Sequence, residues 1–345
     1  MSPTPNNIPV LNGLRALAVI IVFMTHASNS YFGGLFGGAG AGQTGVMLFF
    51  VLSGLLMGHL YLNVPATRTA LLDFAVKRIA RIYPLFFCVV MVCYGLARSG
   101  WILDDYRLGM ELLPTLAFVK GASILWTIGP EVIFYAVFLL LWPLWQARRG
   151  VFWAALLAML TLSLLPLDLP LSNSLFALHY RLPYFLAGMF IGLDLSRASA
   201  LFGKSFHWML AVFILAAPQV LGHFIALPEV FYSGTWGLPL YLALTVAFVL
   251  SCLAARPWLL TNPFTEYLGK ISFSFYLIHM VVLKNFTWLP SVAAVTASFL
   301  VTVILSHATY RWIELPSRNL GRRILRKARE TSEPIATISL SETAR

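Results

Sequence analysis

The chain has 345 residues, of which 59% are hydrophobic and 11% are charged, and its mean hydropathy is +0.81. This composition excludes an ordinary soluble domain, in which about a quarter of the residues are charged. The formal net charge of +11 is compatible with nucleic-acid binding, but in a membrane protein the location of the cations matters more than their sum. We therefore expect an all-α, polytopic membrane protein with the lipid bilayer, and no nucleic acid, as a partner.

Ten apolar stretches are long enough, or nearly long enough, to cross a bilayer as helices. The sixth is the weakest, because it is short and carries Pro183 and Gly188. A further apolar piece, 108–120, is too short to span and is predicted to be interfacial or re-entrant. The ten stretches are 14–32, 44–62, 80–97, 123–145, 151–167, 181–195, 207–225, 235–254, 271–289 and 292–311.

The basic residues favour one side of the predicted membrane. If the N-terminus is cytoplasmic, 19 of the 24 Lys and Arg residues fall on the inner side. The positive-inside rule then predicts about ten transmembrane helices with both termini in the cytoplasm. The exceptions, which fall outside or in outward halves, are Arg98, Arg107, Lys120, Arg181 and Lys284.

No linker or internal repeat divides the chain, so we expect one transmembrane domain over residues 1–316 and a cytoplasmic tail over 317–345. The tail is basic from Ser317 to Arg329, which predicts a surface helix on anionic lipid. From Thr331 onward it is polar and lacks aromatic residues, which predicts disorder. The Gly-rich connection over 33–42 is predicted to be a flexible loop, with gating of an outward-facing cleft as the alternative.

The sequence gives no indication of disulfides, a metal site or a cleaved signal peptide. Cys88, Cys93 and Cys252 all lie in apolar stretches, so neither a disulfide framework nor a metal site is indicated. The N-terminus has no basic region, and His26 would interrupt the apolar region of a signal peptide, so we expect the first stretch to be retained.

The first apolar stretch carries Arg15 and, eleven positions later, His26. On a helix, eleven steps of about 100° return to within ~20° of the starting direction and rise ~16.5 Å, so both side chains share one face. Ionisable groups cost about 2.5–3.5 kcal/mol near the centre of a membrane helix, so each needs a role. A cation at the water boundary and an imidazole inside the membrane suit a transferase that uses acyl-coenzyme A. A hydrogen-bonded core histidine is the alternative for His26.

Glu131 lies in a stretch that runs the opposite way, at a predicted depth similar to that of His26. An imidazole oriented by a carboxylate is a workable general base for a hydroxyl acceptor, although the sequence does not show whether the two helices are adjacent. Glu131 could equally well have a structural role, as the partner of an arginine or of a backbone group. Pro130 directly precedes it and is predicted to break the span there.

Arg78 and Arg81 follow Lys77 at the start of the third stretch. Residues three apart are neighbours on one helical face, which suits a pair of guanidinium groups to a diphosphate. A positive-inside anchor is the plain alternative, and Arg15 on the same predicted side favours binding.

The remaining candidates are substrate-binding residues. The pair Ser53-Gly54 is predicted to permit close approach of a helix or a slender ligand, and Ser53 is not expected to be a nucleophile because no base is spaced around it. Tyr276 and His279 are three apart and either line a polar cavity or serve the structure. Together with the two aromatic residues that flank Glu131, the candidates are Ser53, Trp126, Tyr135, Tyr276 and His279.

These segments resemble, in order, the motifs of the acyltransferase-3 family of bacterial integral-membrane O-acyltransferases. The resemblance covers nearly all of residues 8–318, and six motifs in order are far more specific than any one of them. The matching segments are Leu11–Ala18 followed by His26, Gly45–Met57, Arg78–Pro84, Trp126–Tyr135, Ile271–His279 and Glu314–Pro316.

The resemblance implies a multi-pass protein of the bacterial inner membrane that transfers an acyl group, most often acetyl, from cytoplasmic acyl-coenzyme A. The acceptor would be a hydroxyl of a carbohydrate, a glycolipid or another envelope molecule, and envelope-biosynthesis proteins would be further partners. By carry-over, His26 is the catalytic base and Glu131 supports the site. The coenzyme A phosphates would be held by Arg15, Arg78 and Arg81.

Departures from the family pattern limit what can be carried over. Asn12 and Met47 stand where the family often has Asp, so any role of those two carboxylates is absent or moved. The family's optional extracytoplasmic hydrolase-like domain has no counterpart in these residues, so we expect transfer to finish within the membrane domain or to be completed by a separate protein.

Two other functions stay open at this point. A transporter or flippase for a lipid-linked saccharide would also place charges along a substrate path, but the chain shows no repeat symmetry and its cations cluster at one face. A non-catalytic scaffold for an envelope synthase is the third and weakest hypothesis.

Overall fold

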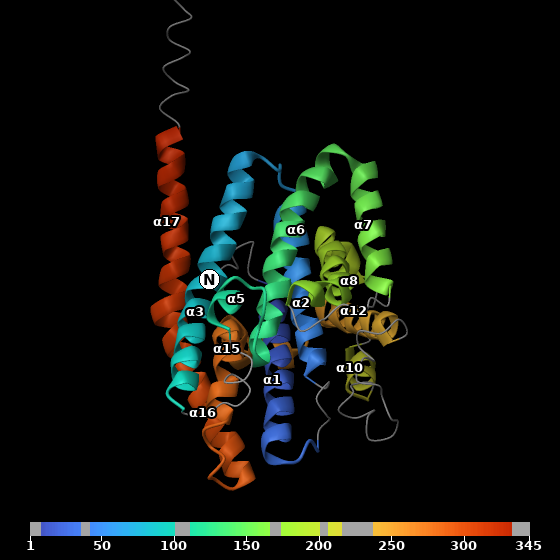
Figure 1. Ribbon diagram of the computed structural model, residues 1–345. Coiled ribbons are helices and arrows are strands. Elements are labelled where there is room, and N and C mark those ends of the chain that lie inside the picture. The colour runs from blue at the N-terminus through green and yellow to red at the C-terminus, as the bar shows by residue number, and fades with distance from the viewer. Residues whose placement is uncertain are drawn as a thin grey trace, which may run out of the picture.

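The computed structural model describes residues 8–35, 42–100, 111–165, 174–200, 206–215 and 237–332, and within these ranges all regular structure is helical (Figure 1). The all-α prediction is therefore confirmed for the described part of the chain. The elements are α1 (Pro9–Tyr31), α2 (Gln43–Met57), η1 (Gly58–Leu62), α3 (Arg68–Arg98), α5 (Leu112–Leu116), η2 (Ser123–Thr127), α6 (Ile128–Ala147), α7 (Arg149–Leu164), α8 (Ser174–Leu193), α9 (Leu195–Ala200), α10 (Phe206–Leu215), α12 (Gly237–Ala255), α13 (Trp258–Thr261), α14 (Pro263–Lys270), α15 (Ser272–Leu283), α16 (Ser291–Thr309), η3 (Tyr310–Glu314) and α17 (Leu315–Ser332).

Among the described residues, five helical stretches are long and apolar enough to cross a membrane. Three further apolar helices are shorter, with 10–17 residues each. Every one of the ten predicted stretches overlaps a described helix, although 207–225 does so only at α10. The chain is thus a multi-pass membrane protein, while the number of ten spans and the orientation stay predictions. The five stretches are Pro9–Tyr31, Gln43–Leu62, Arg68–Arg98, Ser123–Ala147 and Ser291–Glu330.

Local chemistry sets where several helices begin. The Thr67 hydroxyl caps α3 by accepting from the Ala70 N–H at 3.2 Å, and Asn262 caps α14 in the same way. At the predicted break near Pro130, the 3-10 helix η2 ends and α6 begins, so this proline falls in the first turn, where a missing N–H costs least. Glu131 consequently lies at the N-terminal end of α6, where the helix dipole favours a negative charge.

Helix α1 is the central element and packs against α2, α13, α14 and α15. A Cβ atom on Gly13 would lie 1.9 Å from the Leu260 carbonyl oxygen, and one on Gly269 would lie 1.9 Å from the Asn12 carbonyl oxygen. Only glycine permits these approaches of backbone to backbone. The first turn of α1 is therefore clamped against α13 and α14, and this clamp sets the position of Arg15 two residues later.

Helices α2 and α8 form an equally close contact. A Cβ atom on Gly54 of α2 would lie 1.9 Å from the Phe185 carbonyl oxygen, and one on Gly188 of α8 would lie 1.9 Å from that of Val51. Small residues that let two backbones meet are the usual means of packing helices in a membrane. The close approach predicted for the Ser53-Gly54 pair is thus confirmed, with a helix as its partner.

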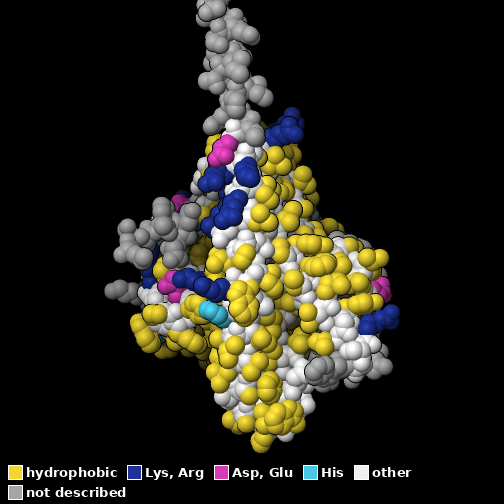
Figure 2. Space-filling view, turned by 90° about the vertical axis from the view of Figure 1, so that its left-hand side faces the viewer, with side chains coloured by type: hydrophobic (Ala, Val, Ile, Leu, Met, Phe, Trp, Pro, Cys, Tyr) yellow, Lys and Arg dark blue, Asp and Glu magenta, His cyan; other side chains and the backbone are white. Residues whose placement is uncertain are grey.

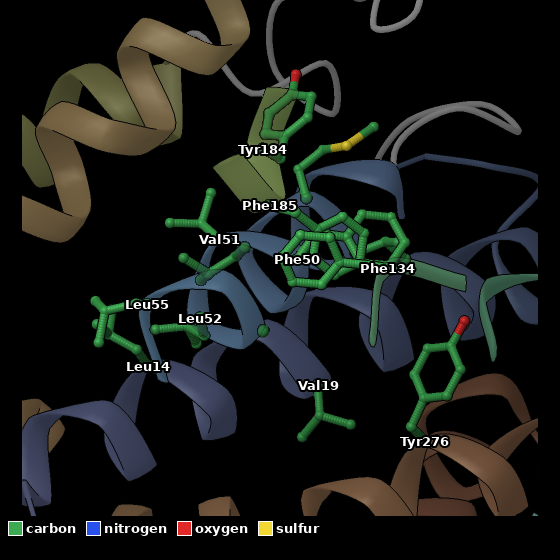
Figure 3. Packing of buried hydrophobic residues seen from close by; sticks show 14 of the residues in the cluster. Leu14, Val19, Phe50, Val51, Leu52, Leu55, Phe134, Tyr184, Phe185 and Tyr276 are labelled. Atoms are coloured by element: carbon green, nitrogen blue, oxygen red, sulfur yellow. The ribbon is translucent and has the colours of Figure 1, made fainter. Parts of the chain in front are cut away.

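An aromatic stack fills the space beside this contact (Figure 3). The ring centroid of Phe185 lies 4.6 Å from that of Phe50 and 4.1 Å from that of Phe134. The three rings come from α8, α2 and α6, so the stack ties these helices together. Tyr276 of α15 lies at the lower right of the same view.

The predicted basic tail is helical as α17, which continues α16 through the π-helical turn η3 and runs alongside α3 (Figure 1). Gly321 packs against Ala80, and Arg329 forms an ion pair with Asp73. Figure 2 shows Lys and Arg side chains along the upper part of the face that includes this helix, above a surface covered by hydrophobic side chains. Binding to anionic lipid stays a prediction, and residues 333–345, like 36–41 of the Gly-rich connection, lie outside the described residues.

The contact between α2 and α8 can be tested by Gly54→Ala. Because the new methyl group would overlap the α8 backbone, we expect the free energy of unfolding to fall by about 1–3 kcal/mol. Gly95→Ala in α3 is the matched control, since nothing lies within 4 Å of its Cβ position and alanine favours a helix more than glycine does. Thermal unfolding in detergent measures both, and equal melting temperatures for the two variants would contradict this packing.

Candidate active site

Two cavities lie along α1. The first, which we call the basic cavity, is narrow, with a volume of about 60 Å³, and is bounded by α1, α2, α3, η2, α6 and α15. It contains two of the three predicted phosphate-binding arginines and the predicted site carboxylate. Its described lining residues are Arg15, Val46, Phe49, Phe50, Ser53, Arg81, Thr127, Ile128, Glu131, Ser272, Phe273 and Tyr276.

Glu131 is held in this cavity by two hydroxyl donors. Ser53 Oγ donates to its Oε1 atom at 2.8 Å, and the Tyr135 hydroxyl donates to the same oxygen at 2.5 Å. Ser53 comes from α2, so the sequence around it held no sign of a carboxylate partner 78 positions away. Two hydroxyl donors and the N-terminal end of α6 thus fix the position of this carboxyl group in the cavity.

The arginines of the basic cavity form one electrostatic cluster with this carboxylate. Arg15 interacts with Arg81 and Arg78 unfavourably and with Glu131 favourably. Its guanidinium is also 3.5 Å from the Asn12 Oδ1 atom, at the position where the family often has Asp. Positive charge therefore exceeds negative charge around the cavity, which favours an anionic ligand.

Arg78 lies beside the basic cavity and is absent from its described lining. Its guanidinium carbon is 5.4 Å from the ring centroids of Phe74 and Tyr135 and 5.7 Å from that of Tyr61. Its Nε atom is buried without a hydrogen-bond partner among the described residues. The three aromatic rings thus hold the Arg78 guanidinium by cation–π contacts, close to the basic cavity but not on its described lining.

Glu314 completes the cluster, although sequence reasoning gave it only as part of a motif. It is 3% exposed, accepts a hydrogen bond from Ser274 at 3.2 Å and lies 3.7 Å from Arg318. It also interacts electrostatically with Arg81 and, more weakly, with Arg15. A second carboxylate, at the point where η3 joins α17, therefore offsets part of the positive charge of Arg81.

The second cavity, which we call the histidine cavity, has a volume of about 280 Å³ and contains His26. The His26 ring centroid is 5.4 Å from that of His279, which is fully buried. His279 Nδ1 lies 2.7 Å from the Tyr276 carbonyl oxygen and donates to it, which leaves Nε2 as the acceptor nitrogen. The described lining residues are Val22, His26, Asn29, Ser30, Gly42, Gln43, Val46, Ser123, Ile124, Trp126, Tyr276, Met280 and Lys284.

Val46 and Tyr276 belong to the walls of both cavities. The Tyr276 hydroxyl donates to the Ile124 carbonyl oxygen at 3.2 Å and accepts from the Thr127 hydroxyl at 3.1 Å. This phenol is therefore anchored to η2, and with Val46 it forms the partition between the arginines and His26.

The predicted site residues are thus distributed over two neighbouring compartments. We expected His26 and Glu131 to form a pair. In the structure Glu131 lines the basic cavity, whereas His26 lines the histidine cavity. Trp126 joins His26, while Tyr135 serves Glu131. Gln43 and Lys284 were missed as site residues, and for Lys284 the available signal was its exception to the positive-inside pattern.

Comparison with known proteins assigns the family. A family model described as an acyltransferase domain, that of the acyltransferase-3 family, matches residues 8–311. The chain belongs to this family. No solved structure matches the chain.

Relatives of this acyltransferase-3 chain occur in Staphylococcus aureus and carry the name "Putative O-acetyltransferase". The protein of strain COL is 25% identical over 92% of this chain, and those of strains MSSA476 and MRSA252 are 24% identical over the same share. In each case the match covers 58% of the relative, so the chain spans little more than half of their length.

Substitution of Glu131 tests the charge balance of the basic cavity. Glu131→Leu removes the acceptor of two hydroxyl donors and the counter-charge of the arginines, so we expect a loss of about 2 kcal/mol or more in unfolding free energy. Glu131→Gln keeps an acceptor oxygen and should lose less. Glu266→Gln is the control, because its ion pair with Lys270 is partly exposed. Urea or thermal unfolding in detergent measures all three, and a Glu131→Leu variant as stable as the unsubstituted protein would refute the balance.

Proposed function

We propose that the chain is a membrane O-acyltransferase that moves an acyl group, acetyl by preference, from cytoplasmic acyl-coenzyme A to a hydroxyl of a sugar or other envelope acceptor. The observation that carries the proposal is the succession of two cavities along α1, one with Arg15 and one with His26, that share Tyr276 and Val46. The family and the names of the relatives support the same chemistry.

The basic cavity is assigned to the donor. Coenzyme A carries phosphate groups at one end of a slender pantetheine arm, and guanidinium groups bind phosphates with paired hydrogen bonds. Arg15 and Arg81 would contact the phosphates, and Arg78 would add positive potential from its aromatic cage. Glu131 and Glu314 then act as positioning residues that keep the guanidinium groups in place without cancelling their charge. The narrow cavity suits the arm, which would point its thioester toward Tyr276.

The histidine cavity is assigned to the acceptor. His26 removes the proton of the acceptor hydroxyl as its oxygen attacks the thioester carbonyl carbon. The carbon–sulfur bond breaks, the ester forms, and the proton passes from the imidazolium to the departing thiolate. His279 keeps the His26 ring in place by ring contact, and Trp126 offers an aromatic face to a sugar. The thioester must reach past the partition, so the Tyr276 side chain is the residue that both substrates would touch.

The role of His26 is tested by His26→Ala. Loss of a general base lowers turnover by about 10²–10⁴-fold, so we expect acetyl transfer from labelled acetyl-coenzyme A to envelope vesicles to become undetectable. Binding of coenzyme A, measured by calorimetry, should be unchanged because the phosphates lie in the other cavity. His307→Ala is the control, since His307 lines neither cavity. Full transfer activity in His26→Ala would end the proposal.

The donor assignment is tested by Arg81→Gln with two thioesters. Loss of one charge-assisted contact should weaken coenzyme A binding by about tenfold or more. The same variant should use S-acetyl-N-acetylcysteamine, which has the thioester but no phosphate, as well as the unsubstituted protein does. Arg326→Gln is the control, because Arg326 is exposed and pairs with Glu330 at 3.4 Å. Equal losses with both thioesters would show that Arg81 supports the fold and does not bind phosphate.

A further inference from the structure

The histidine cavity has a cation that the transfer chemistry above does not use. On α15 and its C-terminal cap, Tyr276, Met280 and Lys284 line this cavity at steps of four residues, which puts them on one helical stripe that climbs ~6 Å per step. His26 lies opposite on α1. Lys284 is thus the far end of the wall that begins at the partition, and its side chain is partly buried.

The charged side chain on the described lining of this cavity is basic. Among its described lining residues Lys284 carries a positive charge, and none of them is Asp or Glu. Lysine at the end opposite Arg15 also departs from the positive-inside pattern, so membrane orientation gives no reason for it. A partly buried cation facing a cavity of about 280 Å³ attracts an anionic group of whatever enters.

A second cation lies directly behind the same wall. The Arg181 guanidinium donates to Gln43 Oε1 at 3.4 Å and lies 5.4 Å from the Trp126 ring centroid, and both of these residues line the cavity. Its Nε atom is buried without a hydrogen-bond partner among the described residues. Because the Gln43 oxygen accepts from Arg181, the amide NH₂ group of Gln43 is left to donate to a ligand.

We infer that the histidine cavity binds an acceptor that carries an anionic group, a carboxylate or a phosphate ester, in addition to the hydroxyl that is acylated. This inference rests on the proposed function for the hydroxyl and on the cations for the anionic group. Lys284 pairs with the anion, Gln43 donates to it or to a neighbouring hydroxyl, and Trp126 stacks on the sugar ring. Lys284 is five residues beyond His279, a rise of ~7.5 Å, so the anion lies away from the reacting oxygen, on another part of the acceptor.

The test is equilibrium binding to the full chain in lipid nanodiscs. The probes are p-nitrophenyl β-D-glucuronide, p-nitrophenyl β-D-glucoside and p-nitrophenyl β-D-glucoside 6-phosphate, which differ in the anionic group. We expect at least one anionic glycoside to bind about tenfold tighter than the neutral one, and Lys284→Gln to abolish that difference. The anionic probe that binds tighter tells carboxylate from phosphate.

Two variants keep this test specific. Lys284→Arg retains the charge and should retain the preference, while Lys120→Gln removes a cation that pairs with Glu111 at 2.6 Å outside the cavity and should change nothing. Equal binding of charged and neutral probes, no binding of any probe, or an equal loss with all three in Lys284→Gln would each overturn the anion site.

The outcome is separable from that of the proposed function. Binding needs no turnover, so a charge preference that depends on Lys284 in a protein without acetyl transfer would refute the transferase and keep the anion site. Acetyl transfer that depends on His26 but shows no preference for anionic acceptors would support the transferase and refute the anion site.

Discussion

The structure depends on how a few charges are accommodated inside an apolar helical bundle. Arg15, Arg81 and Glu131 meet at one narrow cavity, and uncompensated charges there would be costly to bury. Hydroxyl donors and the N-terminal end of α6 offset this cost for Glu131, and the charge of Glu314 offsets part of the charge of Arg81. The cluster still keeps an excess of positive charge. A bundle that retains such an excess at the wall of a cavity is arranged to receive an anion, which a purely structural ion network would not require.

Backbone contacts, more than side-chain volume, place these charges. Gly13 and Gly269 let the first turn of α1 meet α13 and α14, and Gly54 and Gly188 let α2 meet α8. Each contact is too close for any Cβ atom, so these glycines permit the helix spacing that places the polar residues where they lie. In a membrane, where burial of apolar surface does not drive helices together, such close packing supplies the attraction. The geometry of the candidate site and the packing of the bundle therefore depend on the same glycines.

What could be predicted from the sequence follows from how local each property is. The phase of Arg15 and His26 depends on the helical period of a single segment, and α1 is helical throughout. The break before Pro130 depends on proline's missing N–H, which is also local. The partners of Ser53 and His26 depend on which helices pack side by side, and that is decided by contacts dozens of residues apart. Similar depth along two helices suggested His26 and Glu131 as a pair, yet depth alone does not say on which side of Tyr276 each side chain lies.

The wall formed by Tyr276 and Val46 separates the two cavities, and this separation has a chemical consequence for the proposed reaction. A thioester and an acceptor that met in one open channel would share it with water, and hydrolysis would compete with transfer. Under the proposed function, separate compartments would let each substrate bring its own charge to its own cations, Arg15 and Arg81 in the basic cavity and Lys284 in the histidine cavity. Tyr276, whose hydroxyl is anchored to η2, and Val46 are the only described residues that line both cavities. In the proposed reaction the thioester has to pass this wall, so the contacts that anchor the Tyr276 hydroxyl to Ile124 and Thr127 bear directly on whether the two substrates meet.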